Sequence, residues 1–171
     1  MAELTHSERL QPALLDRLTD DDPQHKQESR DKSVLSLHQL RRAVLRDMGW
    51  LLNTVNFSSV MSLEAYPQVA RSVINYGTPD LSGHTASNVD IHGLERLLRQ
   101  AIIDFEPRFL KHTVKIKLRM SESQMDHNAL SFDIEAELWA QPVPLHLYMK
   151  TEVDLETGNV SVTDSSGKGF A

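Results

Sequence analysis

Apolar residues recur at spacings of three and four in two long stretches of the chain, which is the pattern of amphipathic helices. The first predicted helix covers residues 34–52, with Ser33 as its N-cap. The second covers residues 90–105 and is expected to end before Pro107, because the residue before a proline is pushed out of the helical region. A short helix is predicted to begin at Pro67, since proline is favoured in the first turn of a helix.

After residue 113 the hydrophobic period changes from 3.6 to 2, which predicts a β-meander with one buried face. We expect strands in four stretches of the chain: residues 114–120, 130–138, 145–155 and 160–162. In one antiparallel register the outward faces of the first two strands carry opposite charges side by side, pairing Lys115 with Glu137, Lys117 with Glu135 and Arg119 with Asp133. Helices followed by strands predict an α+β fold, with the helices packed on one face of a small, largely antiparallel sheet.

The first 33 residues differ from the rest, because they are polar apart from a few leucines. Leu14, Leu15 and Leu18, together with Leu10, form one stripe of a short helix. Two interpretations are open: a frayed first helix, or an anchor on a flexible leash that docks its leucines on a partner. The expected organisation is a flexible segment at 1–33, a single α+β domain at 34–163 and a disordered tail at 164–171.

Composition narrows the class of protein. The chain has 171 residues, no cysteine and a formal net charge of −6. Without cysteine it has no disulfide framework and no thiolate metal site. An acidic chain is not expected to be a dedicated nucleic-acid binder, which needs a basic face. The sequence has no secretory signal and no apolar run near the ~20 residues of a membrane span. We therefore expect a soluble, cytoplasmic protein that does not insert into membranes.

Motifs of the common enzyme classes do not occur in the sequence, which lacks G-x-S-x-G, H-E-x-x-H, a P-loop and G-x-G-x-x-G. The eight histidines are scattered and none has a second ligand at metal-binding spacing within its own element. The pair of facing carboxylates needed for glycoside hydrolysis is not visible either. We expect no catalytic residue, no metal and no cofactor.

Glu106 occupies an unusual position, because it follows the end of a predicted helix, where the macrodipole disfavours an acid. Pro107 restricts the backbone beyond it, and in an extended triplet the side chains of Glu106 and Arg108 point to roughly the same side. One interpretation is a structural corner in which Glu106 pairs with Arg108 or a neighbouring base. The other is a rigid fork that offers a carboxylate and a guanidinium to a partner. The residues alone favour the corner.

Four short motifs occur together in the chain: LLDRL at 14–18, RDMGWLLNT at 46–54, SVINYG at 72–77 and FEPR at 105–108. In this order and spacing they resemble the TssE family, the baseplate wedge subunits of the bacterial type VI secretion system. TssE is similar to a wedge protein of contractile-tailed phage baseplates. The resemblance covers about residues 10–163, nearly the whole chain.

The resemblance implies a fold like the handshake domain of contractile sheath proteins. The implied role is to complete the baseplate wedge and to present a platform on which the sheath polymerises. Expected partners are the baseplate subunits TssF, TssG and TssK and the sheath proteins TssB and TssC. Two other interpretations remain: an anti-adaptor-like binding module of similar fold, and a peptidoglycan hydrolase. The family has carried a lysozyme-like label, but the carboxylate pair needed for that reaction is not visible in this sequence.

The resemblance also implies roles for particular residues. Glu106, Pro107 and Arg108 match a family motif that contacts other baseplate subunits, and this favours the fork over the bare corner. The leucines at 14–18 match the N-terminal motif of the family. An architectural role is expected for four residues at helix exits: Asn53, Asn75, Tyr76 and Gly77. The last strand should leave an open sheet edge at Val160 and Val162, on which a strand of a sheath subunit would pair.

Overall fold

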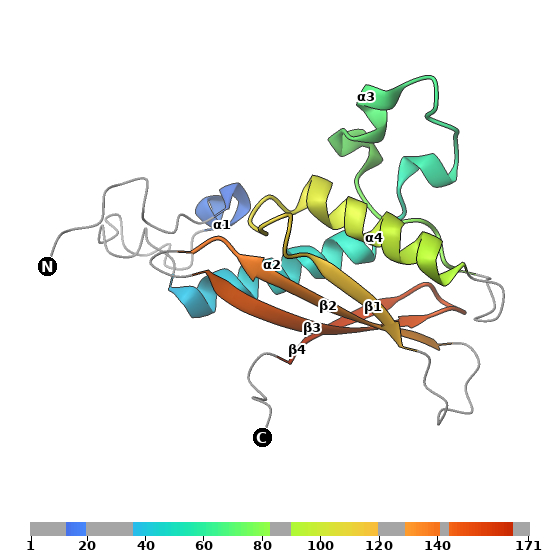
Figure 1. Cartoon of the computed structure of the whole chain (residues 1–171). Coiled ribbons are helices and arrows are strands. Elements are labelled where there is room, and N and C mark those ends of the chain that lie inside the picture. The colour runs from blue at the N-terminus through green and yellow to red at the C-terminus, as the bar shows by residue number, and fades with distance from the viewer. Residues whose placement is uncertain (1–12, 20–35, 83–89, 120–128, 141–143, 166–171) are drawn as a thin grey trace, which may run out of the picture.

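The structure is a computed structural model that describes residues 13–19, 36–82, 90–119, 129–140 and 144–165. Its body has two layers, a four-stranded antiparallel sheet and two long helices that cover one face of it (Figure 1). The sheet order follows the chain: β1 (Lys115–Arg119), β2 (Ala129–Leu138), β3 (Leu145–Asp154) and β4 (Val160–Asp164). The covering helices are α2 (Leu37–Leu52) and α4 (Ile91–Phe105). The predicted α+β fold is therefore confirmed.

The core lies between the helices and the sheet. Val44 and Met48 of α2 and Ile102 of α4 are completely buried against the inward side chains of β2 and β3. Helix α2 begins three residues later than predicted, because Ser36 accepts a hydrogen bond from the Gln39 N–H while the Gln39 side chain accepts one from the Ser36 N–H. The prediction of Ser33 as the N-cap is therefore wrong, and Ser33 itself lies outside the described residues.

The predicted register between β1 and β2 is wrong by two residues. Lys115 lies opposite Glu135, and Lys117 lies opposite Asp133. A shift of two leaves every side chain on its predicted face, so the hydrophobic pattern cannot detect it. The backbone of Glu137 decides the register: its N–H donates to the Thr113 hydroxyl at 3.0 Å and its C=O accepts from the Leu110 N–H at 2.8 Å. The backbone of Glu137 is therefore hydrogen-bonded to the segment before β1 and does not pair with Lys115.

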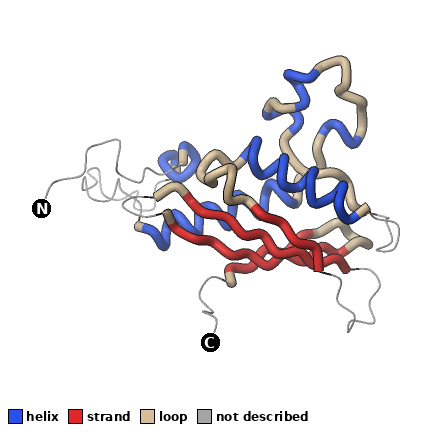
Figure 2. Tube along the Cα trace, in the orientation of Figure 1, coloured by secondary structure: helices blue, strands red, loops and turns tan. Residues whose placement is uncertain are grey.

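A protruding segment, residues 55–78, connects α2 to the loop before α4 and stands away from the two layers (Figure 2). It holds three short helices: η2 (Phe57–Ser59), α3 (Pro67–Ala70) and η3 (Val73–Asn75). Pro67 begins α3 as predicted, but the helix ends after four residues and a separate 3-10 turn follows it. We call this segment the excursion.

The two ends of the excursion are joined to each other. Val55 and Thr78 form a parallel β-bridge, and Thr78 donates its N–H to the Thr54 C=O at 2.8 Å. Gly77 beside the bridge has a φ of +128°, and a Cβ at this position would overlap the Thr54 carbonyl. Inside the segment the buried Asn75 side chain accepts from the Ser58 N–H and donates to the Ala70 C=O, each at 2.8 Å. The excursion is therefore a closed and internally braced loop.

None of the helices in the described part of the chain has the length and apolar character needed to cross a membrane.

Candidate protein-binding site

The Glu106-Pro107-Arg108 triplet forms a corner directly after α4. The N–H of Glu106 still donates to the Ile102 C=O at 2.9 Å, while Glu106 has left the helical conformation. Its carboxylate turns back under the corner and is only 4% exposed, whereas Pro107 is exposed. Arg108 donates to this carboxylate from its backbone N–H at 3.1 Å and from Nε at 2.7 Å, and an Nη nitrogen contacts the second carboxylate oxygen. The expected pairing of Glu106 with Arg108 is present.

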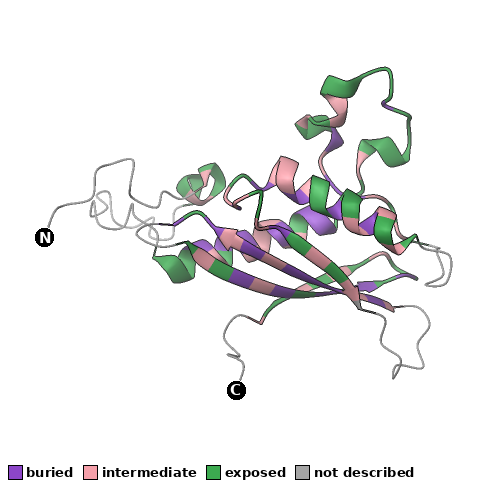
Figure 3. Cartoon of the chain, in the orientation of Figure 1, coloured by how far each residue is buried: buried purple, intermediate pink, exposed green. Residues whose placement is uncertain are grey.

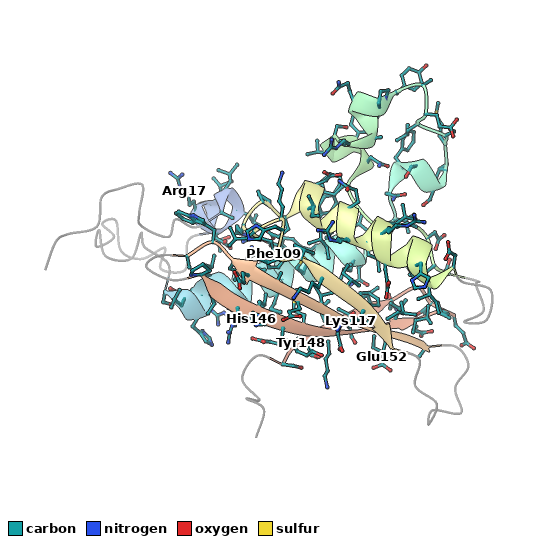
Figure 4. All side chains as sticks on the ribbon, viewed as in Figure 1. Arg17, Phe109, Lys117, His146, Tyr148 and Glu152 are labelled. Carbon is teal, nitrogen blue, oxygen red and sulfur yellow. The ribbon has the colours of Figure 1, made fainter. Side chains whose placement is uncertain are left out.

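The corner is attached to the end of β2. Phe109 forms an antiparallel bridge with Leu138, and the Arg108 C=O accepts from the Trp139 N–H at 2.8 Å. The Phe109 ring is buried in the core between the layers (Figure 4). These contacts hold the triplet at a defined position relative to the sheet.

Asp47 of α2 connects the corner to a second arginine. Arg108 donates from Nη2 to one oxygen of Asp47 at 2.6 Å, and Arg46 donates from Nε to the other at 2.9 Å. Arg46 in turn contacts Asp16 at 2.5 Å and lies over the Trp50 ring, with its Cζ atom 4.9 Å from the ring centroid. The result is an alternating line of charges that we call the charge row: Asp16, Arg46, Asp47, Arg108 and Glu106.

The pKa values of the two arginines in the charge row, and of the neighbouring Tyr76, are raised. Burial acts to lower the pKa of Arg108, but the bond to Glu106 and the charges of Glu106 and Asp47 outweigh it, so this pKa is raised. The bond to Asp16, ahead of that to Asp47, raises the pKa of Arg46. Tyr76 packs edge-on against Phe105 with 5.3 Å between ring centroids, and burial, followed by the charges of Asp47 and Glu106, raises its pKa. The site thus holds both arginines firmly charged.

The leucine segment is the helix α1 (Leu14–Leu18), which is held on the body by its polar side. The Asp16 carboxylate points to Arg46, while the three leucines point outward and are 71%, 46% and 74% exposed for Leu14, Leu15 and Leu18. Leu10, the fourth residue of the predicted stripe, lies outside the described residues. Figure 4 places Arg17 at the outer side of α1. The helix therefore offers an apolar surface next to the charge row.

The two edges of the sheet differ in how they are covered. At β1, Glu95 of α4 accepts from the Leu118 N–H and Arg99 donates to the Val114 C=O, each at 2.9 Å. At β4, Asn53 at the end of α2 accepts from the Val160 N–H and donates to the Val160 C=O, each at 2.8 Å. Since antiparallel pairs alternate, the N–H and C=O of Val162 also face away from β3.

The structure joins two of the three predicted groups. The leucine segment and the triplet meet through Arg46 and Asp47, whereas Val160 and Val162 lie at the far strand of the sheet. Three contributors to these surfaces were not predicted from the residues: Asp47, Phe109 and the edge-covering role of Asn53. The motif at 46–54 is the sequence signal for Asp47 and Asn53, which it contains, whereas Phe109 lies outside all four motifs. Among the described residues, no three histidine, aspartate or glutamate side chains are grouped to hold a metal.

The described residues therefore form a small α+β domain that presents a braced charged corner and exposed leucines. A family model described as baseplate wedge protein gp25 matches residues 38–143, more than half of the chain. The chain therefore belongs to the baseplate wedge protein gp25 family, a family of structural baseplate proteins that interact with other baseplate components. No curated protein and no solved structure gives a significant match.

Proposed function

We propose that this chain is the TssE subunit of a type VI secretion baseplate, where it completes the wedge and templates polymerisation of the contractile sheath. The observation that supports this most is the charge row, which joins three of the four motifs that resemble TssE, those at 14–18, 46–54 and 105–108. The buried Glu106 carboxylate engages Arg108 through Nε and Nη2 and so holds the guanidinium in a fixed orientation before any partner binds.

Within the triplet we propose a division of roles. Glu106 is nearly inaccessible and acts as a positioning residue beneath the corner. Pro107 and the accessible part of Arg108 contact another baseplate subunit, among TssF, TssG and TssK. The leucines of α1 add an apolar contact beside them, because Leu14 and Leu18 are more than 70% exposed and Leu15 is 46% exposed. An apolar patch flanked by an oriented arginine resembles the central part of a typical protein interface.

The proposed role is non-enzymatic and cytoplasmic. A glycosidase needs an acid and a base on opposite sides of its substrate. Glu106 and Asp47, the carboxylates nearest the corner, instead share Arg108 between them. This arrangement favours a structural contact over general acid–base chemistry.

For sheath templating we propose that β4 is the edge on which strands of TssB and TssC pair. Side chains of α4 cover the β1 edge. At the β4 edge, Asn53 covers the outward-facing backbone of Val160 but not that of Val162. Backbone pairing would then begin at Val162, and Asn53 would limit how far an added strand extends.

Sheath assembly in cells tests the proposal. In a strain that lacks this chain and carries fluorescent TssB, complementation with Pro107→Ala/Arg108→Lys should abolish sheath formation while the purified variant remains folded. Arg42→Ala is the matched control, because Arg42 is an exposed arginine outside the charge row. Normal sheaths in the double variant would refute the contact role of the triplet, and sheaths in the strain without the chain would refute the proposed function.

A further inference from the structure

The excursion carries a second apolar surface that is separate from the charge row. Seven large apolar side chains are exposed on it: Val55, Phe57, Val60, Met61, Tyr66, Val73 and Ile74. Val60 and Val73 are each 82% exposed, the highest values among the exposed large apolar residues in the described part of the chain. Figure 3 shows the excursion as mainly exposed and standing clear of the sheet. This number of exposed apolar side chains on one protruding element indicates an interaction site.

The surface is built on a rigid support. The bridge between Val55 and Thr78 closes the base, Asn75 ties the two arms, and Arg71 donates to Asp104 of α4 at 3.1 Å. A preformed surface loses little conformational entropy on binding, so most of its apolar burial is available as affinity. Its protruding shape requires a concave partner surface.

Charge selects the class of partner. Of the 24 residues from 55 to 78 only Glu64 and Arg71 are charged, and Arg71 is engaged by Asp104. Insertion into an anionic membrane surface relies on lysine and arginine beside the apolar residues, and this surface offers none that is unengaged while the whole chain carries −6. An uncharged apolar groove on a protein is complementary to the excursion, because binding there would leave no charge buried without a partner.

We propose that the excursion is a docking knob that inserts Val60, Val73 and their apolar neighbours into an uncharged, apolar groove of another protein. The interaction is independent of the charge row and of the β4 edge. It should therefore persist at salt concentrations that weaken contacts made through Arg108.

Site-specific photocrosslinking in the native host identifies the occupant. p-Benzoylphenylalanine replaces Val60 or Val73 in the full chain, and the same probe at Leu37, an exposed apolar residue at the start of α2, is the control. The expected result is one crosslinked protein from positions 60 and 73 that is absent from position 37. That protein, once purified, should bind the wild-type chain equally in low and high salt. The double variant Val60→Asp/Val73→Asp should weaken this binding by about 100-fold, and Leu37→Asp should not.

Four results would overturn the proposal. These are crosslinking to lipid with sedimentation on phosphatidylglycerol vesicles, crosslinking of two copies of this chain, binding that disappears in high salt, and binding unchanged by the two aspartates. Because Val60 and Val73 are almost fully exposed, the aspartates should leave the fold intact, and equal unfolding midpoints of the variant and the wild type confirm this. A negative result for the excursion would not affect the test of Arg108, since the two surfaces share no residue.

Discussion

Asp47 and Arg108 are 61 positions apart in the sequence, and their side chains meet at 2.6 Å. Asp47 bonds Arg46 with its other oxygen, so one carboxylate links the N-terminal helix, α2 and the corner after α4. Neither residue is accessible enough for its charge to be fully solvated, with side-chain exposures of 22% and 24%. Folding of the corner and docking of α1 therefore depend on the same group.

Arg108→Ala should destabilise the fold by about 3 kcal/mol, because it leaves the buried Glu106 carboxylate without its partner. Urea unfolding measures the loss, and Glu106→Gln combined with Arg108→Ala should recover part of it. Arg42→Ala should stay within about 0.5 kcal/mol of wild type. An equal cost for the single and the double variant would show that the buried charge is not the cause.

Asp16→Asn should release α1 without affecting the body. The ion pair of Asp16 with Arg46 is the side-chain contact by which α1 is held among the described residues, and the body keeps its own core. Hydrogen exchange should show faster exchange at residues 17–19 and unchanged protection in α2. Protection that persists in the variant would mean that the leucines, rather than Asp16, hold the helix.

Asn53→Ala should uncover the backbone of Val160 and lengthen the open edge of β4. We expect a loss of about 1 kcal/mol in stability and a greater tendency to self-associate, measured by sedimentation velocity. Asn53→Asp keeps the acceptor for the Val160 N–H but sets a carboxylate oxygen against the carbonyls of Val160 and Gly49, so it should destabilise the fold at least as much as Asn53→Ala. A variant that stays monomeric at high concentration would argue against Asn53 as an edge cover.

Gly77→Ala should cost about 2–3 kcal/mol, since it combines a left-handed φ with overlap on the Thr54 carbonyl. Limited proteolysis should cut the excursion faster in this variant. Gly49→Ala is the matched control: nothing lies within 4 Å of the added Cβ, and this site inside α2 should gain about 0.5–1 kcal/mol. Equal effects at both positions would contradict the geometric explanation.

Tyr76 should make stability fall at alkaline pH. Its folded-state pKa is raised, so its contribution is fully present below the ordinary tyrosine pKa of about 10 and is lost as the pH rises through the folded value. Tyr76→Phe should remove this part of the alkaline loss, which is seen by comparing unfolding curves at neutral and alkaline pH. If the free energy of unfolding falls with pH equally steeply in both proteins above pH 10, Tyr76 is not the cause of the alkaline loss of stability.

Local patterns in the sequence predicted the fold class well, because periodicity reports which face of an element is buried. They placed α4 and the turn into α3 correctly, since Pro107 and Pro67 act on their own neighbours. The strand register was wrong because a two-residue shift preserves the alternation, and the decisive bonds of Glu137 involve residues 24 and 27 positions away. Such contacts have no local signature.

The candidate site was predictable only in part for the same reason. Glu106 and Arg108 are two positions apart, so their pairing could be predicted locally. The expected extended backbone is wrong, however, because Pro107 and Arg108 form a turn in which the Phe109 N–H donates to the Glu106 C=O at 3.3 Å. The bonds from Asp47 to Arg108 and from Asn53 to Val160 cross 61 and 107 positions, and they exist only once α2 has packed on the sheet. The exposure of Val73 was not predictable either, since α3 ends at Ala70 and Val73 belongs to the separate turn η3.

The closed base of the excursion has a consequence for how this domain can change over time. Because Thr54 and Thr78 are already hydrogen-bonded neighbours, the chain between them can be shortened, lengthened or exchanged without moving either long helix. The contacts that we propose for the excursion can therefore be altered while the bridge at its base is kept. A chimera that replaces these residues with a tight turn should fold with the same sheet and helices.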